Sequence, residues 1–247
     1  MNANNKTARI AGLFYLAIIA AGIFAQFAIR DSLTVAGDAA ATAQNILAAR
    51  SFFQWGIAGD LVMIISDIAV ALLLYVLVKP VNSGLSLLAA FFRLIQAAIL
   101  GVNLLNLFAV LQLLSGADYL NVLGTETLYA QAFFHLQAHA IGYSLGLIFF
   151  GLNCLVFGYL VFRSGYLPRI LGALLIFAGA GYLTDSFASF FLPTYANYAD
   201  IFALVVFLPA IVGELSLALW LIVKGVGGKA QTHTSPARQV LAEGARV

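Results

Sequence analysis

The sequence predicts an all-α, polytopic membrane protein: a bundle of six transmembrane helices with both termini in the cytoplasm. Its composition carries this prediction, because 63% of the 247 residues are hydrophobic and only 9% are charged. A soluble domain needs about a quarter of its residues charged to cover its surface. The mean hydropathy of +1.00 is also that of a strongly apolar chain, so we expect lipid to cover most of the exterior.

Six segments are long and apolar enough to span a bilayer, which takes roughly 20 residues of helix. They lie at 10–29, 52–78, 84–114, 131–162, 170–191 and 200–223. The third and fourth exceed the hydrocarbon thickness, which indicates tilt or protrusion into water. The alanine-rich stretch 30–51 is typical of a short interfacial helix. We expect residues 1–224 to form one transmembrane domain and the tail 225–247, which lacks periodicity, to be disordered.

The distribution of Lys and Arg predicts the orientation. With the N-terminus inside, the cytoplasmic flanks hold nine cations: Lys6, Arg9, Lys79, Arg163, Arg169, Lys224, Lys229, Arg238 and Arg246. The outer loops hold only Arg30 and Arg50, while Arg93 lies inside a helix. Since cytoplasmic loops carry the excess of cations, we expect a multi-pass protein of a prokaryotic cytoplasmic membrane.

Composition also limits the partners and the chemistry. The net charge is only +2 and no basic run occurs, so a nucleic-acid partner is not expected. The single cysteine, Cys154, excludes an intrachain disulfide. The lipid bilayer and a small solute or ion are the expected partners. No protein partner is indicated and no cofactor is predicted, although a metal ion stays open as an alternative.

Apart from Asp200, which begins the sixth segment and belongs with the outer loops, five charged side chains occur within the predicted spans: Asp60, Asp67, Arg93, Asp185 and Glu214. Each costs about 2.5–3.5 kcal/mol at the bilayer centre, so they should face the interior of the bundle. From the helical rise, Asp67, Arg93 and Glu214 lie near the midplane, and we expect an ion-paired group there. Asp60 and Asp185 lie in the outer half at the depth of His139.

Polar residues also line one face of the fourth segment, where Gly142 and Gly146 permit close approach of a neighbouring helix. The third segment has a looser polar arc. Together these residues predict a polar core as the binding site: Asp60, Asp67, Arg93, Asn103, Asn106, His135, His139, Asp185 and Glu214.

Three functions are compatible with such a core. The first is binding or conduction of a small solute or ion, linked to protons, because charge kept at hydrocarbon depth usually serves a path or a site. The second is a metal-dependent hydrolase in the membrane, with His135, His139, Asp60 and Asp185 as ligands. The third is a non-catalytic scaffold or sensor. No nucleophile motif is present, so an enzyme is the less favoured class.

The segment 163–172, Arg-Ser-Gly-Tyr-Leu-Pro-Arg-Ile-Leu-Gly, and its continuation 180–187, Ala-Gly-Tyr-Leu-Thr-Asp-Ser-Phe, carry a family resemblance. With the opening 8–16, Ala-Arg-Ile-Ala-Gly-Leu-Phe-Tyr-Leu, they resemble a bacterial and archaeal family of integral membrane proteins catalogued as a domain of unknown function. The likeness covers residues 8 to about 224. It implies a multi-pass membrane protein, with no established activity and no catalytic residues.

Overall fold

The computed structural model describes residues 3–226, apart from the side chains at 3, 196, 199, 200, 203, 205 and 207. The predicted disordered tail therefore lies, from residue 227 on, outside the described residues. Within the described part all regular structure is helical. The predicted fold class is confirmed in this respect.

The first helical stretch has three parts in direct succession: α1 (Ala3–Ile23), a π-helical turn η1 (Phe24–Arg30) and α2 (Asp31–Leu33). The elements that follow are α3 (Ala39–Ala48), α4 (Arg50–Val78), α5 (Ser83–Leu113), the 3-10 turn η2 (Asp118–Leu123), α6 (Thr125–Ser164), α7 (Arg169–Phe191), the 3-10 turn η3 (Tyr195–Asn197) and α8 (Ala199–Val223).

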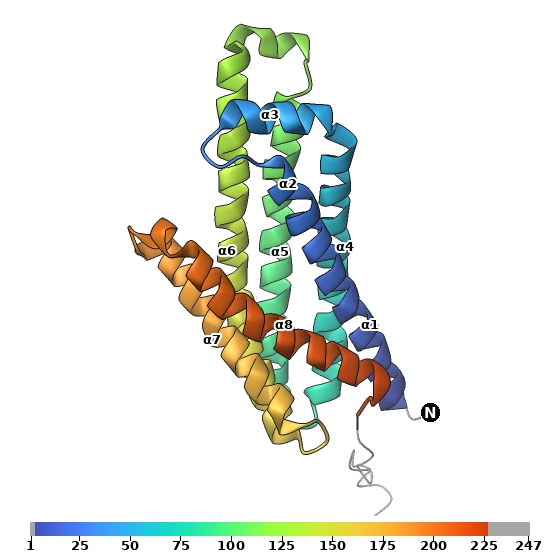
Figure 1. Cartoon of the computed structure of the whole chain (residues 1–247). Helices are drawn as coiled ribbons and strands as arrows, with labels where there is room; N and C mark the ends of the chain where they lie inside the picture. The colour runs from blue at the N-terminus through green and yellow to red at the C-terminus, as the bar shows by residue number, and fades with distance from the viewer. Residues whose placement is uncertain (1–2, 227–247) are drawn as a thin grey trace, which may run out of the picture.

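Five helices are long and apolar enough to cross a membrane: Asn4–Leu33, Arg50–Val78, Ser83–Leu113, Thr125–Ser164 and Arg169–Phe191. Five of the six predicted segments are thus helices of spanning length. The sixth lies in α8, whose described apolar stretch, Leu208–Val223, is shorter. As predicted, α5 and α6 are the longest spans, and Figure 1 shows them projecting beyond their neighbours at one end of the bundle.

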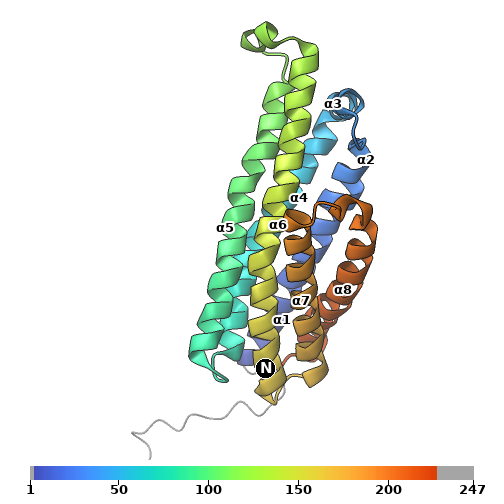
Figure 2. The ribbon, with the colours of Figure 1, turned by 90° about the vertical axis from the view of Figure 1, so that its left-hand side faces the viewer.

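The helices form an upright group and an inclined pair. Helices α4, α5 and α6 stand side by side with α1 next to α4, whereas α7 and α8 lean together across the lower part of the group (Figures 1 and 2). Helix α3, in the predicted interfacial stretch, lies across the upper part of the bundle, below the projecting ends of α5 and α6 (Figure 1). It begins where Asp38 accepts a hydrogen bond from the Ala41 amide at 2.8 Å, which caps its first turn.

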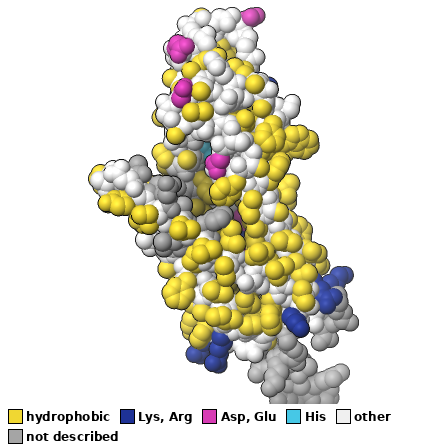
Figure 3. Space-filling view, viewed as in Figure 1, with side chains coloured by type: hydrophobic (Ala, Val, Ile, Leu, Met, Phe, Trp, Pro, Cys, Tyr) yellow, Lys and Arg dark blue, Asp and Glu magenta, His cyan; other side chains and the backbone are white. Residues whose placement is uncertain are grey.

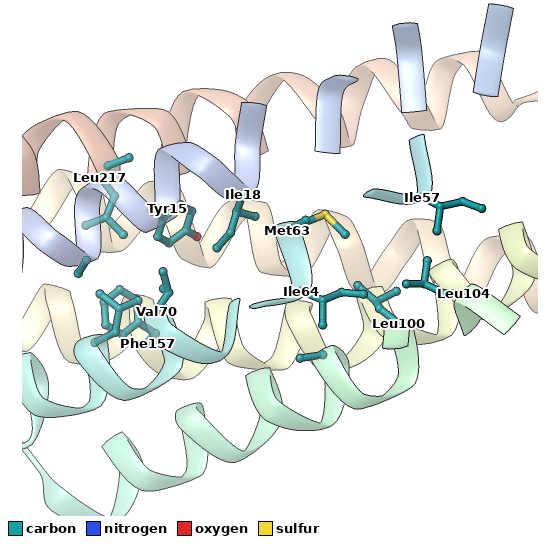
Figure 4. Close-up of a cluster of buried hydrophobic side chains, with 14 of the residues drawn as sticks. Tyr15, Ile18, Ile57, Met63, Ile64, Val70, Leu100, Leu104, Phe157 and Leu217 are labelled. Carbon is teal, nitrogen blue, oxygen red and sulfur yellow. The ribbon is translucent and has the colours of Figure 1, made fainter. Parts of the chain in front are cut away.

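The core between these helices is apolar over most of its length. In Figure 4 the side chains of Tyr15, Val70, Phe157 and Leu217, from four helices, point into the interior between the ribbons. Because the outer surfaces of the helices are also apolar, hydrophobicity alone does not hold them together in lipid, and close packing must contribute.

Glycines allow the closest helix contacts. Gly151 and Gly158 of α6 face Gly179 and Gly172 of α7, and a Cβ added to Gly158 would lie 2.8 Å from the Gly172 carbonyl oxygen. Gly142 and Gly146 of α6 face α5 instead, as the sequence predicts for a close approach. Small residues at helix interfaces are the usual device for packing in membranes.

At the lower end in Figure 1, α1 and α8 pack tightly against each other. A Cβ on Gly12 would lie 2.7 Å from the Ala218 carbonyl oxygen and equally close to the Ile222 side chain. The side chain of Asn5 accepts a hydrogen bond from the Val226 amide at 3.0 Å. The two ends of the described chain therefore lie at the same end of the bundle.

Charge is distributed unevenly along the long axis. Figure 3 shows Lys and Arg side chains gathered at the end that holds the N-terminus, and Asp and Glu side chains at the opposite end. Hydrophobic side chains dominate between them. The chain therefore presents an apolar band between a basic end and an acidic end, which is the pattern of a protein that sits across a bilayer.

Candidate functional site

The π-helical turn η1 directs Arg30 toward the bundle interior. Its wider winding is seen at the Asp31 amide, which bonds to the Gln26 carbonyl five residues earlier. The Gln26 side chain donates to Asp31 at 2.8 Å and accepts from Arg30 Nε at 2.9 Å. Single π-turns inside α-helices occur frequently at functional sites. Here the turn fixes the orientation of the guanidinium.

Arg30 forms a buried ion pair with Asp60 of α4. The Arg30 Nη1 and Asp60 Oδ2 atoms are 2.5 Å apart, and Nη2 donates to Oδ1 at 3.3 Å. The sequence predicts Arg30 in an outer loop, which is wrong, and it does not predict Arg30 as the partner of Asp60. The reason is that the first helix continues through η1 to Leu33, which keeps Arg30 on an inward face.

Asp67 and Arg93 form the second buried ion pair, as predicted. Arg93 Nε donates to Asp67 Oδ1 at 2.8 Å, and Nη2 lies 2.6 Å from the same oxygen in ion-pair contact but out of line for a hydrogen bond. The other carboxylate oxygen accepts from Gln96 at 3.2 Å. Both charged side chains are 1% exposed.

Two aromatic rings enclose the Arg93 guanidinium. Its central carbon lies 4.8 Å from the centroid of the Tyr15 ring and 5.0 Å from that of Phe150. Arg93 Nη1 also donates to Asn153 at 3.4 Å. Cation–π attraction is strongest where the cation has lost its water. The arrangement therefore stabilises a charge that lipid would reject.

Glu214 of α8 is held by two phenols. The Tyr182 hydroxyl donates to Oε1 at 2.7 Å and the Tyr15 hydroxyl donates to Oε2 at 3.2 Å. Among the described residues no cation lies within ion-pair distance of this carboxylate, which is 7% exposed. The predicted ion-paired group of Asp67, Arg93 and Glu214 was therefore wrong in its third member. Tyr15 links Glu214 to Arg93 through its hydroxyl and its ring.

A cavity of about 460 Å³ connects these groups. It runs along the first helical stretch from Ile18 to Thr34, and α4 to α8 each contribute lining residues. Of the predicted site residues, Asp67, His139 and Glu214 line it directly. Figure 3 shows the hollow beside the α7–α8 pair, where a histidine and acidic side chains come to the surface.

The remaining predicted polar residues of α5 and α6 form a hydrogen-bonded chain outside the cavity lining. His135 Nδ1 donates to Asn106 Oδ1 at 3.0 Å, since an amide oxygen can only accept. Asn106 donates to Asn103 at 3.0 Å, and Asn103 donates to the His139 carbonyl oxygen at 2.8 Å. These hydrogen bonds connect α5 to α6, so their geometry fits a structural role in helix packing.

Asp185 also lies apart from the cavity lining. It accepts a hydrogen bond at 2.8 Å from Tyr195 in η3. Burial, together with this bond to Asp185, raises the pKa of Tyr195 to about 12. Within the described residues no group of three or more His, Cys, Asp or Glu could hold a metal ion. The structure thus does not bring His135, His139, Asp60 and Asp185 together as one ligand set.

Several residues that line the cavity or contact its lining were missed by the sequence analysis. Arg30 was counted as a loop cation, and Tyr15, Tyr143 and Tyr182 were not singled out. The available signal was depth: these phenols lie well inside apolar segments, away from the interfaces where tyrosine usually sits. A hydroxyl at such depth needs a partner, and for Tyr15 and Tyr182 that partner is Glu214.

The fold and the cavity together define a class: a protein whose described residues form an all-helical bundle, with five helices of spanning length and, between them, a cavity that several charged side chains line. Residues 10–225 match a family described as a domain of unknown function (DUF4386), and the chain belongs to this family. It is 32% identical over 171 residues to an uncharacterised protein from Archaeoglobus fulgidus. The aligned region covers 69% of this chain and 84% of the relative. No solved structure matches the chain.

Proposed function

We propose that the chain is a six-span protein of the cytoplasmic membrane that binds a small molecule in the cavity and exchanges a proton at Glu214. Helix α8 has 25 residues, which suffices for a sixth span. The bond between Asn5 and Val226 supports termini on one side, and the basic end of the bundle supports a cytoplasmic location for that side. On this proposal residues 1–224 are one domain.

The charge balance of the interior carries the proposal. Arg30 neutralises Asp60 and Arg93 neutralises Asp67, which leaves the Glu214 carboxylate without a compensating cation among the described residues. An ionised group at this depth costs about 2.5–3.5 kcal/mol. Glu214 is therefore expected to hold a proton when the cavity is empty and to give it up when a ligand supplies positive charge.

The cavity is placed to receive a molecule from the acidic, outer end of the bundle. Arg30, Asp31 and Thr34 line it near that end, while Glu214 lines its deeper part. Below Glu214 the tight packing of Gly12 against α8 supports a closed cytoplasmic side. The described residues bring no metal-binding group together, so nothing favours the hydrolase alternative.

Water access to the cavity tests the proposal. In a Cys154→Ala background, Leu147→Cys places a thiol in the cavity wall, whereas Leu145→Cys places one on the exposed outer face of the same helix. A charged methanethiosulfonate reacts only with thiolates that water reaches. In proteoliposomes it should therefore label Leu147→Cys, in the cavity, and leave Leu145→Cys, on the lipid-facing surface, unlabelled. If neither thiol reacts, the cavity is dry and the proposed function is wrong.

A further inference from the structure

We infer that the floor of the cavity is a site for an organic monocation, an alkylated or quaternary ammonium, with its charge at Glu214 and its apolar part along the cavity wall. This inference rests on the proposed binding function and names its ligand class. It follows from three properties of the described residues: an uncompensated carboxylate, aromatic faces beside it, and a predominantly apolar wall.

The aromatic faces lie next to the carboxylate. Tyr182, which donates to Glu214 at 2.7 Å, packs against Phe150 with ring centroids 5.2 Å apart at 61°. Both rings and Tyr143 line the cavity together with Glu214. Aromatic faces are the common means of binding quaternary ammonium groups, which have no N–H to donate in a hydrogen bond.

The sign of the charge follows from which groups are already paired. Arg30 is bound on two edges by Gln26 and Asp60, and Arg93, which lies against the Phe150 ring, is neutralised by Asp67. An anion would find neither guanidinium free and would meet the carboxylates instead. A cation would complete the charge balance of the interior.

The size and the lining favour an organic ion over an inorganic one. A volume of about 460 Å³ is much larger than a bare metal ion needs, and the wall includes Ile18, Ile19, Met63 and Ile211. Divalent metals require several carboxylate or imidazole ligands. No such group occurs in the described part of the chain.

Binding of a permanent cation requires the loss of one proton. The protonated Glu214 carboxyl breaks its O–H bond, the proton leaves to bulk water, and the resulting carboxylate pairs with the bound ammonium. The titratable or charged groups that interact with Glu214 come from five other helices: Tyr15 on α1, Asp67 on α4, Arg93 on α5, Tyr143 and Cys154 on α6, and Tyr182 on α7. Since Asp67 and Arg93 balance each other, Glu214 is the group expected to exchange the proton.

A matched pair of ligands tests the inference. Benzyltrimethylammonium and neopentylbenzene have the same shape and differ only in a nitrogen cation or a carbon at the branch point. Binding to the detergent-purified full chain is measured by calorimetry in two buffers of different ionisation heat, which reports the protons released. The wild type is compared with two variants, Glu214→Gln and the control Asp185→Asn. Asp185 is a suitable control because it also accepts a hydrogen bond from a tyrosine but does not line the cavity.

We expect the cation to bind at least about tenfold more tightly than its neutral analogue, with release of close to one proton. Glu214→Gln should abolish both the preference and the proton release, and Asp185→Asn should change neither. If Glu214→Gln does not fold, Phe150→Leu serves instead and should weaken only the cation. Equal affinity for the two ligands, or an unchanged preference in Glu214→Gln, would overturn the inference. With Leu147→Cys still reactive to methanethiosulfonate, that result would leave the water-accessible cavity of the proposed function standing and would remove only the ligand class and the role of Glu214.

Discussion

At the scale of single residues, Arg93 shows what a charge needs at hydrocarbon depth. It has a carboxylate beside it, a tyrosine ring and a phenylalanine ring against the guanidinium, and an amide oxygen at its edge. Each contact replaces part of the hydration that lipid cannot supply. A group held in this way tolerates the loss of a partner poorly.

Arg93→Leu should therefore be strongly destabilising. It leaves Asp67 buried with only Gln96 as a polar partner, and breaking a buried pair costs about 3–5 kcal/mol. Replacing both residues, as Asp67→Leu with Arg93→Leu, should cost clearly less, because no charge is left unpaired. The free energy of unfolding, measured by sodium dodecyl sulfate titration in mixed micelles, checks this. Exposed Arg163→Leu is the control, and a cost below about 1 kcal/mol for Arg93→Leu would contradict the prediction.

Tyr166 offers a prediction outside the membrane segments. Its hydroxyl donates to the Leu77 carbonyl oxygen at 2.6 Å, near the end of α4, and burial raises its pKa to about 12. The unfolded tyrosine ionises near pH 10. The stability from this raised pKa is present in full below about pH 10 and is lost as the pH rises toward about 12.

Tyr166→Phe should accordingly lower the unfolding free energy by about 1–2 kcal/mol at neutral pH, because the Leu77 carbonyl loses its donor. The difference from the wild type should narrow between about pH 10 and 12. Unfolding titrations across this range measure it, with Tyr159→Phe as the control because Tyr159 is 46% exposed. A difference that is constant with pH would argue against the raised pKa.

At the scale of elements, the glycines of α6 and α7 decide how closely these helices approach. Gly158→Ala should destabilise the protein by about 1–3 kcal/mol, since the added methyl would meet the Gly172 carbonyl oxygen 2.8 Å away. Gly101→Ala of α5 is the matched control: it is also helical, has nothing within 4 Å of an added Cβ, and should be neutral or slightly stabilising. Unfolding titrations compare the two variants. Equal changes in the free energy of unfolding would show that the close contact at Gly158 does not restrict the size of the side chain there.

The elements also show which parts of the molecule the sequence could predict. Spans such as 52–78 and 170–191 coincide closely with α4 and α7, because length and apolarity alone select them. The partners of the buried charges were harder to predict, since depth along a helix says nothing about its rotation. Asp67 and Arg93 were paired correctly because their depths agree, whereas the pairing of Asp60 with Arg30 was not predicted.

Arg30 was misplaced for a different reason. The positive-inside rule counts cations near the ends of spans, and a residue at the edge of an apolar segment looks like a loop residue by that measure. The π-turn that carries Arg30 inward has no recognisable sequence signature. The phenols beside Glu214 were missed because composition treats a tyrosine in a span as apolar. Arg30, the π-turn and the phenols beside Glu214 shape the cavity and its surroundings. The sequence therefore predicts a polar core but not the cavity within it.

At the scale of the whole molecule, the number of crossings fixes the sides on which the termini lie. With six spans both ends lie on the same side of the membrane, which we propose to be the cytoplasm, while with five they lie on opposite sides. Fusion of a reporter that is active only in the cytoplasm to each terminus in turn should give signal from both, and a reporter active only outside should give none. Signal from one terminus only would contradict the sixth span. A fusion at the α3 stretch, expected outside, is the control for the opposite side.

The contact between α1 and α8 has a consequence for any solute that uses the cavity. On the proposed function, this contact closes the cytoplasmic side, so a solute that enters the cavity from the outer end would leave by the same route. Passage to the other face would require Gly12 to part from Ala218 and the bond between Asn5 and Val226 to break. On the same proposal, the lack of a side chain at Gly12 is what lets α1 and α8 approach closely enough to keep that side closed.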